Sequence, residues 1–349
     1  MKILSKQLKN ILFLGNHFGQ KKIWEEIPVY LSQNGWDTII ASKKINPFLR
    51  LIDMVWVLWS NRKKYTLAVV DVFSGKAIIW SGFSILLLSL LRKKIILNLH
   101  GGNLPSFARS YPYLINWILR KANVVISPSE YLKSNLSKYR HNIKVIPNPI
   151  NISSYHVTKK FGKGVRLIWL RAFHDIYNPS LCPKVFAIIN IKYPNSYLTM
   201  IGPDKGDGSL LFTKKTSESL SLNSNFQICN EIHRDNVPLI LNQNDIFLNT
   251  TNFDNTPVSV IEAMASGLCI VSTNVGGIPY LLENESDAIL VPPDDPDAMA
   301  EAILRILNDP VLAEKLSTNA RKKAELFDWS IVLPKWEKLL NDLINNEYL

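Results

Sequence analysis

The sequence predicts an α/β protein of two doubly wound domains, each with a parallel sheet covered by helices on both faces. Short runs rich in Ile and Val alternate with longer helical segments from Ile11 to Ile146. Pro147–Pro149 and the polar residues up to Gly164 then interrupt the alternation, which resumes at Val165. A chain of 349 residues is long enough to give each domain its own core.

The first domain is predicted to span residues 1–150. Its strands are expected at Ile11–Leu14, Thr38–Ala41, Leu67–Val72, Ile95–Leu99, Val124–Ser127 and Lys144–Ile146. Helical segments separate these runs, so the strands are expected to be parallel, with ligand sites at their carboxyl ends. Residues 151–164 are polar and contain Gly, which predicts an interdomain linker.

The second domain is predicted to span residues 165–330 and repeats the same alternation. Its strands are expected at Val165–Leu170, Tyr197–Ile201, Phe226–Cys229, Asp245–Thr250, Cys269–Ser272 and Ala288–Val291. Helical periodicity follows at Asp297–Leu307, Leu312–Phe327 and Pro334–Ile344. Residues 331–349 are therefore predicted to form a separate C-terminal helix.

Composition is that of a soluble globular protein, with 47% hydrophobic and 20% charged residues. The cysteines Cys182, Cys229 and Cys269 have no metal-ligand spacing, and their odd number argues against a disulfide framework. A reducing compartment, and hence a cytoplasmic location, is expected. Met1–Lys9 is polar and basic and shows no cleavable signal.

Charge is distributed unevenly between the two halves. Residues 1–150 contain 22 Lys and Arg against 6 Asp and Glu, a net of +16, so the whole-chain value of +11 leaves −5 for residues 151–349. A basic face can meet nucleic acid, anionic lipid or a phosphate-bearing acceptor. Nucleic acid is the weakest of these because no RNA-binding or helix-turn-helix signature is present. Scattered lysines that serve only solubility are the alternative.

The longest apolar run, Ala77–Leu91, is too short to span a bilayer and is interrupted by Ser and Gly. It predicts a helix packed on a sheet. The alternative is a peripheral contact with the inner face of the cell membrane, in which Trp80 and Phe83 enter the lipid beside the basic residues Arg92–Lys94.

The most informative segment runs from Asp254 to Gly267 and continues into a Gly-Gly turn. It places Asp254 in a loop and Glu262 inside an apolar helical run, with Pro257 in the first helical turn. Free N–H groups near Val258 and Ser259 would favour a phosphate, and Glu262 could accept hydrogen bonds from sugar hydroxyls. This pattern indicates a nucleotide-sugar site; the alternative is an ordinary capped helix with its Glu facing solvent.

The region from Asp245 to Pro293 resembles the donor-binding region of the retaining glycosyltransferases of family 4, which have the GT-B fold. That family has an acidic pair separated by seven residues, then Ala-Met-Ala, a strand, and a Gly-Gly turn before Pro. Here the first acid is Asp254, where Glu is usual. The resemblance covers most of the chain. It implies two Rossmann-like domains facing a central cleft, with the last helix packing back toward the first domain.

The resemblance also implies roles for the charged residues. Glu262 would hold the nucleotide ribose, Asp254 would contact the donor sugar, and Arg171 would neutralise the donor diphosphate. The family's Lys about five residues after this Arg is replaced by Ile176. Neighbours that could substitute for that Lys are His174, Tyr177 and Asn178.

Further contacts are expected at strand ends. His100 with Gly101 would meet a sugar hydroxyl, although a lone His is more often structural. The loop Gly15–Gly19 would face the cleft, and Gly202–Gly208 would lie near the nucleotide, with Lys205 adding positive charge. The donor-binding residues expected are thus Gly15, Gly19, Gly101, Gly202, Lys205, Glu231, Thr256, Pro257, Val258 and Ser259, beside the catalytic His100, Arg171, Asp254 and Glu262.

The expected activity is retaining transfer of a sugar from a nucleoside-diphosphate sugar to a hydroxyl acceptor, a glycan or a lipid-linked glycan, in bacterial surface polysaccharide or glycolipid assembly. No metal or other cofactor is expected, because no Asp-x-Asp motif precedes these sites and a helix N-terminus with Arg171 can stabilise the departing diphosphate. The alternatives are a catalytically weakened sugar-binding or scaffold subunit, and a nucleotide-sugar epimerase or a phosphorylase on the same fold.

Overall fold

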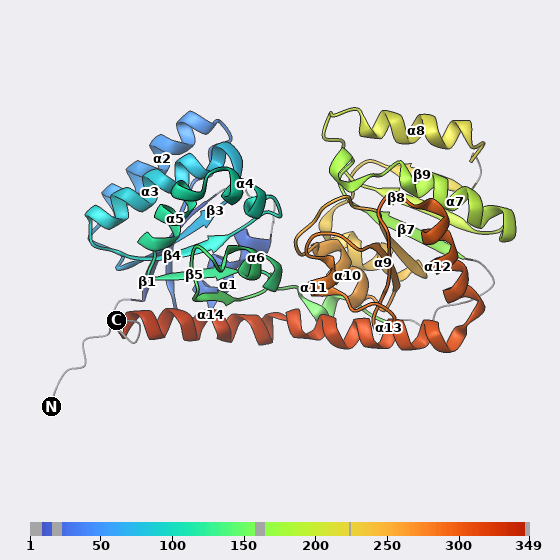
Figure 1. Ribbon diagram of the computed structural model, residues 1–349. Coiled ribbons are helices and arrows are strands. Elements are labelled where there is room, and N and C mark those ends of the chain that lie inside the picture. Colours follow the sequence, from blue (N-terminus) through green and yellow to red (C-terminus); the bar gives the residue numbers. More distant parts are fainter. Residues whose placement is uncertain (1–8, 16–22, 158–164, 223–224, 346–349) are drawn as a thin grey trace. The chain divides into compact units, whose positions relative to one another are not determined.

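A computed structural model describes residues 9–15, 23–157, 165–222 and 225–345 (Figure 1). The chain divides into two compact units. The first combines Met1–Pro149 with Trp329–Leu349, and the second is Ile150–Asp328.

The first unit is built on a six-stranded parallel sheet of order β2-β1-β3-β4-β5-β6. Its strands are β1 Asn10–Leu14, β2 Asp37–Ala41, β3 Leu67–Val72, β4 Lys94–Leu99, β5 Val124–Ser127 and β6 Ile143–Val145. The strands are apolar on both faces, as expected where helices cover both sides of a parallel sheet. The six predicted strands are therefore confirmed to within one or two residues at their ends.

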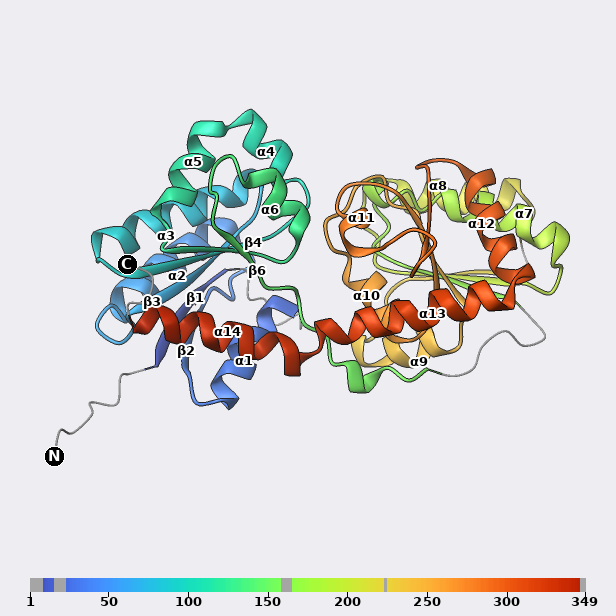
Figure 2. The same cartoon turned by 60° about the horizontal axis from the view of Figure 1, so that its bottom comes forward.

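Helices cover both faces of this sheet. One face carries α2 Pro47–Ser60, α3 Ile78–Leu90, α4 Leu104–Ser110, α5 Pro112–Lys121 and α6 Glu130–Leu136, packed on Leu12, Val70 and Leu97. The other carries α1 Ile23–Gln33 and α14 Trp329–Ile344, packed on Ile11, Val69 and Ile96. Figure 2 shows α14 beside α1, where the rings of Tyr30 and Trp329 stack at 3.7 Å. The C-terminal helix thus supplies part of the first unit's core.

The second unit is built on a six-stranded parallel sheet of order β12-β11-β10-β7-β8-β9. Its strands are β7 Arg166–Leu170, β8 Tyr197–Ile201, β9 Phe226–Cys229, β10 Ile246–Asn249, β11 Cys269–Thr273 and β12 Ile289–Val291. The helices are α7 Leu181–Lys192, α8 Ser209–Ser219, α9 Val237–Asn242, α10 Val258–Ala265, α11 Ile278–Leu281, α12 Pro296–Asn308 and α13 Pro310–Ala324. Two doubly wound units of this kind confirm the predicted GT-B class.

The segment predicted as a linker is partly built into the second unit. Tyr155 of this segment is buried, at 7% exposure, and so is Ile150, at 2%, which was predicted to end the first domain but belongs to the second unit. The N–H of Ile150 donates to the carbonyl of Phe327 at 2.8 Å, and the N–H of Ile152 donates to the Asp328 carboxylate at 3.0 Å. Residues 158–164 lie outside the described residues.

Candidate active site

Helix α10 carries the predicted phosphate cradle at its N-terminus. Pro257 is the N-cap residue, one position before the expected first turn, and α10 begins at Val258. The next residue, Ser259, is 8% exposed, and its hydroxyl has no hydrogen-bond partner within the described part of the chain. An unsatisfied buried hydroxyl at a helix N-terminus suits an anionic ligand, which can accept its hydrogen bond.

Glu262 lies one turn further along α10 and is only 6% exposed. The hydroxyl of Tyr155 donates to its Oε1 at 3.0 Å. The alternative in which this Glu faces solvent is therefore wrong. Tyr155 was not among the predicted site residues, because it precedes Glu262 by 107 positions and no local pattern links the two.

Arg171 and Asp254 form an ion pair, with side chains only 16% and 14% exposed. Arg171 follows β7, and its guanidinium lies 4.3 Å from the centre of the Tyr177 ring. Burial lowers the pKa of Arg171, and Tyr177 and then Glu262 oppose that shift. Separate ligand contacts were predicted for Arg171 and Asp254; in the structure the two side chains pair with each other, and Glu262 lies within electrostatic range of Arg171.

The loop that carries Asp254 is held by the Gly-Gly turn after β11. The N–H of Gly277 donates to the carbonyl of Asp254 at 2.9 Å. A Cβ at Gly276 would lie 2.3 Å from the Asp254 oxygen, and one at Gly277 would lie 2.0 Å from the Asn255 oxygen. The two glycines are therefore needed for close backbone packing beneath the acidic loop.

The three neighbours predicted to substitute for the family's Lys have different partners in the structure. Tyr177 packs against Arg171, whereas the Asn178 side chain donates to Asp294 at 3.2 Å. His174 accepts from the N–H of Ile176 at 3.1 Å through Nδ1. Of the three, Tyr177 is the one the structure brings to Arg171, and it adds no cation.

The remaining predicted residues of the second unit lie at or near strand ends. A Cβ at Gly202 would lie 1.6 Å from the carbonyl oxygen of Arg171, so this Gly allows β7 and β8 to end side by side. Lys205 and Glu231 are exposed in the turns after β8 and β9, and Thr256 is half-buried beside the N-cap. Among these, Gly202 is the one in contact with Arg171.

In the first unit, His100 takes part in a buried polar cluster at the carboxyl ends of β3 and β4. Its Nε2 lies 2.8 Å from Oδ1 of Asp71, and Asn98 donates to the same oxygen at 3.1 Å. The imidazole is 4% exposed and stacks on Phe73 at 4.7 Å. A Cβ at Gly15 would lie 2.0 Å from Oδ2 of Asp71. The structure therefore gathers the predicted Gly15 and His100 around a carboxylate.

Asp71, which the sequence did not mark as a site residue, lies at the centre of this cluster. Its signal was an acid within the apolar run Leu67–Val72, near the carboxyl end of a predicted strand. Gly101, beside His100, is exposed with φ at +80°. Gly19 lies outside the described residues.

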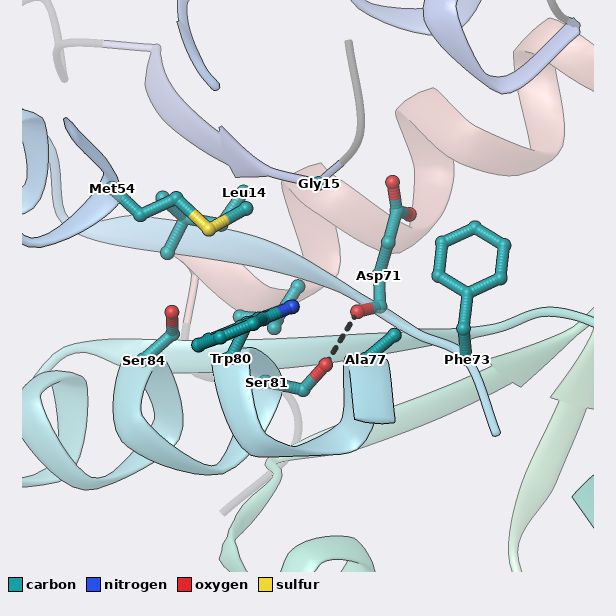
Figure 3. Close-up of a pocket in the computed structure, with 10 residues that line it drawn as sticks. Leu14, Gly15, Met54, Asp71, Phe73, Ala77, Trp80, Ser81 and Ser84 are labelled. Carbon is teal, nitrogen blue, oxygen red and sulfur yellow. Dashed lines mark hydrogen bonds between the residues drawn. The ribbon is translucent and has the colours of Figure 1, made fainter. Parts of the chain in front are cut away.

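A pocket lies next to Asp71, between β3 and α3 (Figure 3). Trp80 and Ser81 of α3 line it together with Gly15 and Met54, and the Ser81 hydroxyl donates to the carbonyl of Asp71 at 2.8 Å. Trp80 packs against the core of the unit. Trp80 is half-buried, whereas Phe83 is 51% exposed, so the contact with lipid stays a prediction.

A search of the described residues for metal sites finds no group of three or more His, Cys, Asp or Glu side chains with suitable geometry. Cys182, Cys229 and Cys269 are free thiols. Burial raises the pKa of the Cys182 thiol, which therefore stays protonated in the core.

Models of known protein families match both units of the chain. The family model for glycosyl transferases group 1 matches residues 157–323, and that for glycosyltransferase family 4 matches residues 34–154. A UDP-Gal:alpha-D-GlcNAc-diphosphoundecaprenol alpha-1,3-galactosyltransferase of Escherichia coli is 26% identical over 196 residues, covering 52% of this chain and 49% of that protein. An N-acetyl-alpha-D-glucosaminyl L-malate synthase of Bacillus anthracis is 24% identical over 275 residues, covering 73% of this chain and 70% of that protein. The chain thus spans about half of the first relative's length.

Solved structures share the fold. Sucrose-phosphate synthase from Thermosynechococcus elongatus matches with a TM-score of 0.82 at 17% identity, over 97% of this chain and 99% of that one. Anabaena HepE in complex with UDP and glucose matches with a TM-score of 0.75 at 15% identity, over 95% and 99%. These structures show the GT-B fold, and with a glycosyl transferases group 1 domain on the second unit and a glycosyltransferase family 4 domain on the first, this protein is a family 4-type glycosyltransferase.

Proposed function

We propose that the chain is a retaining glycosyltransferase that moves a hexose-type sugar from a nucleoside-diphosphate donor to a hydroxyl of a glycan or lipid-linked acceptor. The observation that carries the proposal is the environment of α10. A buried carboxylate on Glu262, an unsatisfied buried hydroxyl on Ser259 and a largely buried guanidinium on Arg171 belong to one small region of the second unit. The Glu262 carboxylate suits a ribose, and the Ser259 hydroxyl and the Arg171 guanidinium suit the phosphates.

Arg171 is the group best suited to stabilise the departing diphosphate. Charge on the diphosphate grows as the glycosidic bond breaks, so a fixed cation and a helix N-terminus stabilise the transition state more than the ground state. The Nε of Arg171 is buried without a partner among the described residues, while another of its nitrogens pairs with Asp254. A guanidinium has five N–H donors, so it can keep Asp254 and still bind a phosphate oxygen.

The retaining outcome is proposed from the family. In front-face displacement the acceptor oxygen bonds to the anomeric carbon on the side that the diphosphate leaves, and a diphosphate oxygen takes the acceptor proton. Asp254 is held by Arg171, and a carboxylate in such an ion pair is a weakened nucleophile. This pairing favours a path without a covalent glycosyl-enzyme.

The relatives suggest the class of substrate. The E. coli relative is named for UDP-Gal and a diphosphoundecaprenol-linked GlcNAc, and HepE is described with UDP and glucose. We therefore propose a nucleoside-diphosphate hexose as donor, and assembly of a surface polysaccharide or glycolipid at the cytoplasmic face of the membrane as the setting.

Incubation of the protein with a panel of nucleotide sugars tests the proposal, with melting temperature as a measure of binding and release of nucleoside diphosphate as a measure of turnover. We expect one donor to raise the melting temperature and to be consumed, with the same rate in EDTA, since Arg171 and the α10 N-terminus supply the positive charge. NMR of the product should show the donor's anomeric configuration.

The results of these assays distinguish the candidate functions. A donor that binds without any release of diphosphate, with every acceptor class supplied, would favour the sugar-binding subunit, to which Asp254 and Ile176 point as departures from the family pattern. An inverted anomeric configuration would overturn the retaining assignment. A strict requirement for Mg²⁺ or Mn²⁺ would overturn the metal-free mechanism.

A further inference from the structure

The outer sides of helices α2 and α3 are apolar and face solvent. Eight large side chains form two stripes at three- and four-residue spacing: Phe48, Ile52, Trp56 and Trp59 on α2, and Ile79, Phe83, Leu86 and Leu90 on α3. Their exposed fractions lie between 45% and 74%. We call these residues the outer stripes.

The inner sides of both helices are already used by the core of the first unit. Met54 and Leu58 of α2, and Ile85 and Leu88 of α3, are at most 4% exposed. The two helices are therefore apolar nearly all round, and α3 contains no charged residue. Helices of this kind are normally covered by protein or by lipid.

Helix α5 extends the apolar surface on the other side of α3. A Cβ at Gly82 of α3 would lie 4.0 Å from the ring of Trp117 on α5, so that ring lies against α3. Tyr113, also on α5, is 90% exposed. Figure 1 shows α2, α3 and α5 side by side, in line with the contacts between them. Exposed apolar groups gathered on three adjoining helices mark an interaction surface.

Positive charge flanks the ends of these helices. Exposed cations stand before, between and after them: Lys43, Lys44, Lys63, Lys64, Lys76, Arg92, Arg109, Arg120 and Lys121. Asp53 is the single acidic residue of the three helices. The buried guanidinium of Arg50 donates to the carbonyls of Lys44 and Ile45 at 2.9 and 2.6 Å, which fixes the loop before α2. The surface is thus apolar at its centre and cationic at its edge.

We propose that this surface docks on an anionic lipid bilayer. Trp and Phe side chains favour the boundary between hydrocarbon and headgroups, and a cationic edge is attracted to anionic headgroups. A second copy of the chain fits less well, because an isologous dimer through this face would bring the cationic edge against itself. The inference rests on the first unit alone; it specifies the membrane contact that the proposed setting implies, and it does not depend on the proposed reaction.

The residues placed to contact lipid in the structure differ from those predicted from the sequence. Trp80 is half-buried and lines the pocket beside Asp71, and two of the three cations after α3 donate hydrogen bonds within the unit. Lys93 donates to the carbonyl of Tyr65 at 2.6 Å, and Lys94 donates to the carbonyl of Leu343. The outward aromatic residues of α2, such as Trp56, take the part that the sequence analysis gave to Trp80.

Co-sedimentation of the full chain with vesicles tests the proposal, using phosphatidylcholine alone and phosphatidylcholine mixed with phosphatidylglycerol. One variant joins Trp56→Ser with Phe83→Ser, and another joins Lys63→Glu with Lys64→Glu. Helix α8 offers matched controls: Leu211→Ser with Phe212→Ser, at 58% and 57% exposure, and Lys214→Glu with Lys215→Glu. All these positions are exposed, so circular dichroism should show unchanged folding.

We expect wild-type protein to bind the anionic vesicles and to be released by salt. The Trp56 and Phe83 variant and the Lys63 and Lys64 variant should each bind the anionic vesicles at least about tenfold more weakly than wild type. Both α8 controls should bind within about twofold of wild type. Equal binding to neutral and anionic vesicles, an equal loss in the α8 controls, or no vesicle binding would overturn the proposal. So would a concentration-dependent dimer that the Trp56 and Phe83 changes abolish while vesicle binding persists. Diphosphate release in lipid-free solution reports separately on the proposed activity.

Discussion

Glu262 is held by a hydrogen bond from Tyr155 inside the second unit, and this arrangement defines a first test. Glu262→Gln replaces an anionic acceptor with a neutral amide and introduces an unwanted donor. A charge-assisted hydrogen bond to ribose contributes about 1.5–3 kcal/mol, so activity should fall roughly ten- to hundredfold. Initial rates of diphosphate release measure the change.

Tyr155→Phe is the matched control. It keeps the carboxylate but removes the donor to Oε1, so the rate should fall less than in Glu262→Gln. Equal rates in wild type and Glu262→Gln would contradict the assignment of Glu262 to the donor site.

Arg171 and Asp254 should differ in how they tolerate change. Arg171→Ala should raise the apparent KM for donor and lower kcat, because the cation stabilises charge that grows during bond breaking. Asp254→Glu keeps the ion pair and introduces the residue usual in the family, so its kcat should equal or exceed that of wild type. Steady-state kinetics on folded variants distinguish the two. Inactive Asp254→Glu would show that the pocket is built around the shorter side chain.

At this scale the sequence predicted residue identities better than residue contacts. The spacing from Asp254 to Glu262 identified the acidic pair, because both lie on one short segment. It could not show that Asp254 pairs with Arg171, or that Asp71 receives hydrogen bonds beneath Gly15, since those partners are brought together by the order of strands in the sheet. Tyr155 was missed for the same reason.

The Gly-Gly turn after β11 fixes the position of the loop that carries Asp254. Gly277 has φ of −87°, which any residue adopts, so Gly277→Ala adds no backbone strain and introduces only a clash with the backbone of Asn255. We expect a lower melting temperature and weaker donor binding, measured by thermal shift with and without nucleotide. Gly82→Ala is the control: its nearest neighbour is 4.0 Å away, and Ala favours a helix over Gly by about 1 kcal/mol. A Gly277→Ala protein that matches wild type in both measurements would contradict the packing argument.

The Asp207 carboxylate helps to hold the turn between β8 and α8. Asp207 accepts from the N–H of Asp175 at 2.7 Å and from that of Ser209 at 3.1 Å, and its interactions first with the Asp175 backbone and then with Ser209 lower its pKa to about 2 from 3.8. The folded state therefore binds the proton less readily than the unfolded state. The stability that Asp207 contributes is fully present above pH 3.8 and is lost as the pH falls through about 2.

Asp207→Asn should remove this pH dependence. The melting temperature of wild type should exceed that of the variant near neutral pH, and the difference should shrink as the pH falls below 3.8. Asp235→Asn, at a side chain 69% exposed, controls for a general loss of charge. A difference that stays constant down to pH 2 would rule out this role for Asp207.

Elements were predictable to a greater degree than contacts. Every strand predicted from an apolar run is present, because strands of a parallel sheet are buried on both faces and so read as continuous Ile- and Val-rich runs. The last helix was predicted within residues 331–349, with helical periodicity from Pro334, yet α14 begins at Trp329 and contains that proline. Proline usually marks a helix boundary, so the local rule placed the start too late.

At the scale of the whole chain, the second unit is one continuous segment whose ends are joined. Ile150 bonds to Phe327, and Ile152 to Asp328, so the segment 150–328 closes on itself. Expressed alone, residues 150–328 should unfold cooperatively and bind nucleoside diphosphate. Residues 1–149 alone lack α14 and should be aggregation-prone, because the apolar face against Ile96 would be open. Calorimetry and light scattering on the two fragments check this, and a stable, monomeric 1–149 fragment would contradict it.

The place of α14 in the chain also sets an order of assembly during translation. The first unit needs Trp336 and Leu340 of α14 to complete its core, and the ribosome makes these residues after the whole of 150–328. The second unit can fold as soon as it has left the exit tunnel, since all its parts are continuous in the chain. The domain synthesised first is therefore the last to mature, and until then its unfinished sheet face depends on chaperones or on rapid completion of the chain.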